Sequence, residues 1–182
     1  MKKIKIIALV SISTFLLSAC GSKYQIDISE MPEEQKTHHE EMLQGFLNQY
    51  ESAENDQSKI EAASEAAGKY MILGDYAEAM KFYKEVLEYD EIYFLALNNL
   101  AVMYERVGEK EKALEYELRL YENNKTNSGI VMDAIRLLVE NNRYDDAIDI
   151  LTAFSVYDKE TGPNYTQIIG DQFGYIMNSQ SE

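Results

Sequence analysis

A period of 34 residues constrains this chain more than any other feature. Alanines recur at that step, at Ala79, Ala113 and Ala147, each within a segment whose apolar residues have helical spacing. The same step relates a set of turn-forming residues: Gly74, Gly108 and Asn142. Self-similarity at this period indicates a helix–turn–helix unit that is repeated three times. In phase, the units span residues 60–93, 94–127 and 128–161.

The recurring residues have physical reasons to stand where they do. Two antiparallel helices approach closely only where their side chains are small, so the alanines mark helix–helix contacts. A residue just after a helix commonly adopts positive φ, which costs glycine little and asparagine less than most residues. We therefore expect the first helix of each unit to end at Gly74, Gly108 or Asn142. Stacked pairs bury the apolar face that one pair leaves exposed. The sequence predicts an all-α solenoid.

In these residues the chain resembles the tetratricopeptide-repeat (TPR) family over positions 60–161. The resemblance implies an α-solenoid of helix–turn–helix repeats that binds other proteins and has no enzymatic activity. Some positions depart from the family pattern. Glu91, Lys125 and Lys159 stand where the family has a late proline, and Glu117 stands at a usually aromatic position.

The first 20 residues read as an export signal. A positive start is followed by a short apolar run at residues 6–17, which is too short to be a comfortable transmembrane helix. Residues 1–19 therefore read as a lipoprotein signal peptide. The ending Leu17-Ser18-Ala19-Cys20 resembles the lipobox of bacterial lipoproteins, which implies cleavage before Cys20 and lipidation of that residue. Residues 20–30 then form a tether. We expect a lipid-anchored protein on the extracytoplasmic side of the cell membrane or outer membrane, in contact with the bilayer through the Cys20 lipid.

The acidic composition narrows the choice of partners. The formal net charge is −15, and loss of three lysines with the signal would make the mature chain more acidic. Such a chain is repelled by nucleic acid and by anionic headgroups. We therefore expect no nucleic acid among its partners.

Two segments flank the repeats. Apolar residues recur at helical spacing between residues 33 and 50, which predicts a flanking helix, and the polar residues 51–59 read as a linker. Residues 162–182 carry another apolar stripe, which predicts a C-terminal capping helix and tail.

The sequence contains few residues that could form a catalytic, metal-binding or phosphate-binding site. His38 and His39 are the only histidines, and adjacent helical residues diverge by about 100°, so they do not converge on one metal ion. Glycine-rich phosphate-binding motifs are absent from the sequence. We expect no catalytic residue, no metal site and no cofactor.

The TPR resemblance can also be tested for capture of a C-terminal carboxylate. The family positions that perform this task hold Ser64, Gly68, Asn99, Gly129 and Asp133 here. Only Asn99 matches, and Asp133 replaces a base with an acid, so this mode of binding is not expected.

The resemblance implies a concave groove lined mainly by the first helix of each unit. The expected partner-binding residues are Met71, Leu95, Asn98, Asn99, Val102, Met132, Arg136 and Val139. The apolar members suit an apolar or amphipathic segment of an envelope protein, and Asn98, Asn99 and Arg136 could hold its backbone or a carboxylate. Alternatively, a terminal helix of the chain itself occupies the groove. A solute- or glycan-binding envelope lipoprotein is the alternative function.

Overall fold

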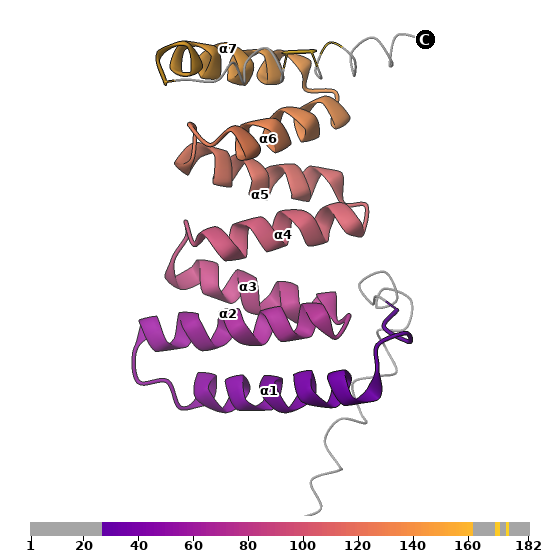
Figure 1. Cartoon of the computed structure of the whole chain (residues 1–182). Coiled ribbons are helices and arrows are strands. Elements are labelled where there is room, and N and C mark those ends of the chain that lie inside the picture. Colours follow the sequence, from indigo (N-terminus) through magenta and orange to yellow (C-terminus); the bar gives the residue numbers. More distant parts are fainter. Residues whose placement is uncertain (1–26, 162–169, 172–173, 175–182) are drawn as a thin grey trace, which may run out of the picture. The chain divides into compact units, whose positions relative to one another are not determined.

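The computed structural model describes residues 27–161 together with residues 170, 171 and 174. It comprises two compact units, Met1–Phe82 and Tyr83–Glu182, which are described separately. The described residues form seven helices (Figure 1): α1 (Glu33–Glu51), α2 (Asp56–Ile72), α3 (Tyr76–Tyr89), α4 (Phe94–Arg106), α5 (Lys110–Asn123), α6 (Ser128–Glu140) and α7 (Tyr144–Thr161). The predicted signal and lipidation site, and most of the predicted capping helix, lie outside these residues.

The helix boundaries follow the 34-residue step. The helices α3, α5 and α7 begin at Tyr76, Lys110 and Tyr144, and α2, α4 and α6 end at Ile72, Arg106 and Glu140. One boundary differs from the sequence prediction. Helix α2 begins at Asp56, inside the predicted 51–59 linker, because the side chain of Asn55 caps it by accepting a hydrogen bond from the Ser58 N–H at 2.9 Å.

The turns inside the three units share one backbone geometry. Gly74, Gly108 and Asn142 have φ of 78°, 76° and 59°, as the sequence predicted. In each turn the following residue donates its N–H to a carbonyl of the preceding helix: Asp75 to Tyr70 (2.9 Å), Glu109 to Tyr104 (2.8 Å) and Arg143 to Leu138 (2.8 Å). This pattern is the Schellman motif, which satisfies carbonyls that the helix leaves unpaired. The three turns are therefore structural equivalents.

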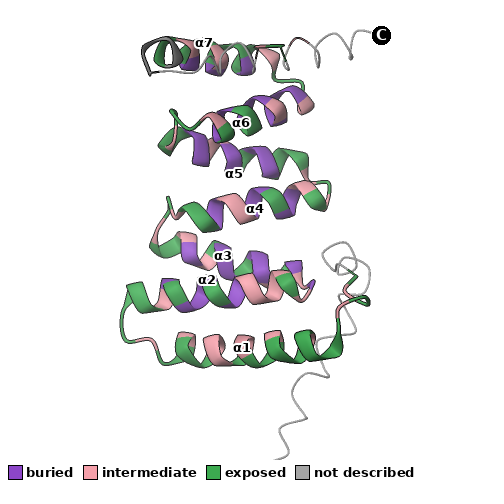
Figure 2. Ribbon diagram, viewed as in Figure 1, coloured by how far each residue is buried: buried purple, intermediate pink, exposed green. Residues whose placement is uncertain are grey.

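The second unit consists of the end of α3 and of α4 to α7, whose consecutive members pack on one another from α4 onward (Figure 1). Its core combines aliphatic side chains with aromatic ones such as Tyr83 and Tyr104, and its most deeply buried side chains include Leu97, Leu100, Met103, Leu120, Val131, Leu137 and Leu138. Ala113 and Ala147 have no exposed surface, as expected for residues at close helix contacts. Figure 2 shows that buried residues recur along α4, α5 and α6.

The first unit contains α1, α2 and the start of α3, and α1 packs on α2. None of the 19 residues of α1 is buried (Figure 2). Phe82 connects the parts of this unit: its ring stacks on Tyr70 at 5.6 Å and meets the edge of Tyr50 at 5.5 Å. No helix among the described residues is long and apolar enough to cross a membrane.

Candidate protein-binding surface

The predicted groove residues of the second unit lie mainly on one surface, which we name the α4–α6 face. It is defined by Leu95, Asn98 and Val102 of α4 and by Met132 and Arg136 of α6. Spacings of three and four residues place the members from each helix on the same side of that helix. The two helices meet here because Arg136 of α6 binds Glu105 of α4.

Three large apolar side chains on this face are open to solvent. The exposed fractions are 45% for Leu95, 38% for Val102 and 38% for Met132. The same two helices bury most of their other apolar residues. Single exposed apolar residues are ordinary, but three on one face form a patch of the kind that binds other molecules.

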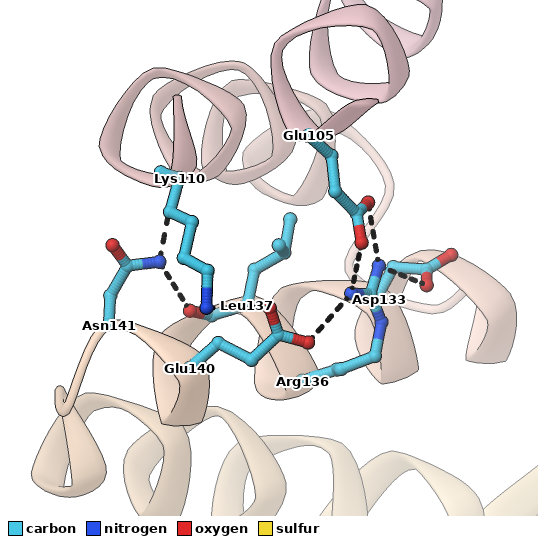
Figure 3. A network of polar contacts seen from close by, with 7 residues as sticks. All are labelled: Glu105, Lys110, Asp133, Arg136, Leu137, Glu140 and Asn141. Carbon is cyan, nitrogen blue, oxygen red and sulfur yellow. Dashed lines mark hydrogen bonds and ion pairs between the residues drawn. The ribbon is translucent and has the colours of Figure 1, made fainter. Parts of the chain in front are cut away.

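A polar network joins α4, α5 and α6 (Figure 3). Arg136 holds both carboxylate oxygens of Glu105, at 2.6 and 3.1 Å, and also donates to Glu140 at 3.0 Å. Arg136 also donates a hydrogen bond from Nη2 to the Oδ1 atom of Asp133 at 3.3 Å. The hydrogen bonds to Glu105 raise the pKa of Arg136 above its ordinary value. Carboxylates of the chain thus already bind the guanidinium of Arg136, and the capture of a partner's carboxylate by this residue stays a prediction.

The network continues to the start of α5. Lys110 lies 3.8 Å from Glu140, in an ion pair that joins α5 to α6 (Figure 3). Asn141, which follows α6, donates to the carbonyl of Leu137 at 2.7 Å and to that of Lys110 at 3.5 Å. These contacts fix α4, α5 and α6 relative to one another close to the exposed apolar residues.

Two other predicted groove residues serve the fold. Val139 lies three residues after Arg136 on α6, but it has no exposed surface, because the chain's own packing covers it. Its predicted contact with a partner is therefore wrong. Asn99 donates its side-chain amide to the Tyr83 hydroxyl at 2.8 Å and thereby ties α4 to α3 within the second unit. Its amide group is committed to this internal contact.

The remaining predicted residues stay available as candidates. The half-buried side chain of Asn98 makes no hydrogen bond within residues 27–161. It lies between Leu95 and Val102 on the same side of α4. Met71 is half-buried on α2 and belongs to the first unit, so it is considered apart from the α4–α6 face.

Glu117 of α5 is a functional candidate that the sequence analysis noted only as a departure from the family pattern. Its side chain is 6% exposed and makes no hydrogen bond or ion pair with the described residues. Burial raises its pKa from 4.5 to about 7, assisted by the charges of Asp133 and Glu105 and opposed by Arg136. An acid at a usually aromatic position was the signal that could have identified it.

The histidines do not form a site with other ligands. The rings of His38 and His39 lie 5.8 Å apart on α1. Among the described residues, no group of three or more histidine, cysteine, aspartate or glutamate side chains is arranged to hold a metal ion.

Comparisons with known proteins bear on the fold. No protein-family model matches the chain, and no curated protein matches it. A solved tetratricopeptide repeat protein from Parabacteroides merdae ATCC 43184 is similar with a TM-score of 0.56 and 14% identity, over 80% of this chain and 61% of that one. The structure of MamA AMB-1 is similar with a TM-score of 0.50 and 14% identity, over 81% of this chain and 87% of that one.

The present chain thus spans 61% of the length of the Parabacteroides protein. At 14% identity these likenesses concern the fold alone. They agree with the repeat period, the three equivalent turns and the paired helices. The chain has the fold of a TPR α-solenoid.

Proposed function

We propose that this protein is a membrane-anchored, non-enzymatic scaffold of the bacterial cell envelope. Its α4–α6 face binds an apolar or amphipathic segment of a partner protein. The TPR fold suggests interaction with proteins. The observation that carries the proposal is the exposure of Leu95, Val102 and Met132 together on this face.

The composition of the face suits a peptide segment. Exposed aliphatic side chains bind the apolar side of a helix or strand, and the flexible thioether of Met132 adapts to the shape of the bound residue. The carboxamide of Asn98 carries both donors and an acceptor, which match the N–H and C=O groups of a peptide backbone. An apolar patch beside an amide that makes no hydrogen bond within residues 27–161 suits the recognition of a peptide.

The membrane anchor rests on the sequence. Lipidation of Cys20 accounts for the single cysteine of an exported protein, and it would hold the scaffold close to envelope partners. Labelling with a palmitate analogue tests it: the wild-type protein incorporates label and the Cys20→Ala variant does not. Equal labelling of both, or none in the wild type, contradicts the anchor.

Photocrosslinking in the native cell tests the binding surface. A photoreactive amino acid is placed at Val102 or Met132, and in a control at Glu115, an exposed residue of α5 outside the face. We expect a discrete crosslinked partner at the first two positions and none at the control, with the partner then identified by mass spectrometry. Crosslinks only within the chain, to residues 162–182 or to α1, would show that the chain covers its own face and would contradict the proposal.

A further inference from the structure

We propose that the α4–α6 face selects partner segments that carry a basic side chain, which binds at the carboxylates of Glu105, Glu117 and Asp133. This inference rests on the proposed function and adds the chemistry of the partner. It follows from an imbalance of charge at the face and from the carboxyl group of Glu117, a residue that is 6% exposed and makes no hydrogen bond or ion pair with the described residues.

The charges beside the apolar patch do not balance. Three carboxylates gather there, from Glu105, Asp133 and Glu140, against the two cations Arg136 and Lys110. Arg136 cannot neutralise all of them, because its closest contacts go to Glu105 and Glu140. Asp133 keeps 57% of its side chain exposed and is reached by Arg136 only at 3.3 Å. An added cation would find unused carboxylate oxygens.

Glu117 points to a ligand independently of that count. It is more than nine-tenths buried and makes no hydrogen bond or ion pair within residues 27–161. The charged groups that act on it come from both helices that pack on α5: Glu105 of α4, and Asp133 and Arg136 of α6. A buried acid without a partner is costly in its charged form. A partner's ammonium or guanidinium group would remove that cost.

The apolar residues next to these acids define the rest of the segment. Met132 directly precedes Asp133, and Val102 lies one turn before Glu105. A bound segment therefore needs an apolar side with a lysine or arginine beside it. A segment with an acidic residue at that place would be repelled by the surplus carboxylates. The net charge of −15 on the whole chain adds to this repulsion.

The test uses the full mature chain and three synthetic amphipathic peptides. The peptides share one leucine face and differ at a single central polar position, which holds lysine, glutamine or glutamate. Fluorescence anisotropy measures their dissociation constants. We expect the lysine peptide to bind roughly tenfold more tightly than the glutamine peptide, as a charge-assisted hydrogen bond supplies, and the glutamate peptide to bind most weakly.

Variants of the protein test whether the preference for lysine over glutamine arises at Glu117. Glu117→Gln should remove most of the lysine preference, whereas Glu122→Gln, at an exposed acid of the same helix, should keep it. Binding of a cation favours ionised Glu117. The affinity of wild type for the lysine peptide should therefore fall as the pH is lowered from 8 to 6, relative to its affinity for the glutamine peptide. Glu117→Gln should lack this dependence.

The outcomes separate the two proposals. Equal affinities for lysine and glutamine peptides, both abolished by Val102→Glu, would overturn this inference and leave the binding face intact. If the lysine preference persists in Glu117→Gln, it arises from the net charge of the chain, and this result would also overturn the inference. If no peptide binds, or if Val102→Glu leaves binding unchanged, both proposals fail.

Discussion

The three turns and the α4–α6 face differ in how they relate to the repeat. The turns at Gly74, Gly108 and Asn142 have the same sign of φ and the same hydrogen bonds in every unit. The polar network has no such equivalents. The residues 34 positions before and after Glu105 are Met71 and Val139, and the residue 34 positions before Arg136 is Val102. Features that repeat are those every helix pair needs, so the features that occur once are the better candidates for function.

The largest effect should come from a repeated, close-packed position. Ala113 is fully buried where α5 packs on its neighbours, and leucine there would overpack the contact at a cost of about 1–3 kcal/mol. We expect Ala113→Leu to lower the melting temperature clearly in thermal denaturation. Ala77→Leu, at an exposed alanine, should leave it almost unchanged. If both variants melt alike, the repeat frame is wrong.

A change at Glu117 should stabilise the protein, in contrast to Ala113→Leu, because the charge of Glu117 opposes folding. Its pKa is about 7 in the folded protein against 4.5 ordinarily, so the folded state binds the proton more tightly. The cost of the charge is therefore fully present above pH 7, declines as the pH falls and is absent below about 4.5. Glu117→Gln should raise the free energy of unfolding at pH 8 by on the order of 2 kcal/mol.

Denaturant unfolding at several pH values measures this difference between variant and wild type. The gain should disappear near pH 4, where the wild-type carboxyl is protonated in both states. A gain that does not depend on pH, or a loss at pH 8, would contradict the assignment of a buried, unpartnered acid. The control Glu122→Gln should show little change at any pH, because that side chain is exposed.

Two glycines sharpen the comparison between a turn and an ordinary helical position. A Cβ at Gly108 or at Gly45 would meet nothing within 4 Å, but Gly108 has φ of +76° whereas Gly45 lies inside α1. Gly108→Ala should therefore lower stability by about 1 kcal/mol through backbone strain. Gly45→Ala should raise it by roughly 0.5–1 kcal/mol through helix propensity. Thermal melts with the same sign for both would contradict the assigned turn geometry.

These contrasts show which parts of the structure the sequence could predict. The positive φ of Gly74, Gly108 and Asn142 was predictable because it depends on local backbone geometry, and the buried alanines were predictable because they recur with the period of the repeat. Asn99 and Arg136 were assigned to a partner, and both bind groups of other helices, which periodicity alone does not reveal.

Burial of Val139 and of Glu117 was harder to foresee for the same reason. Each depends on how closely a neighbouring helix approaches, whereas the position within the repeat gives only the side of the helix. The lipid anchor at Cys20, the capping segment at 162–182 and the bound partner remain predictions. Cys20 and most of residues 162–182 lie outside the residues that the structure describes.

The most direct test of the open α4–α6 face combines partner binding with stability in Val102→Glu and Met132→Glu. Both side chains are 38% exposed, so the changes should cost little stability, about 0.5 kcal/mol or less. We predict that both variants keep the wild-type helicity and melting temperature but lose the partner captured by photocrosslinking from Leu95, another residue of the face. Undiminished capture by both variants, or a large fall in their melting temperatures, would contradict the account.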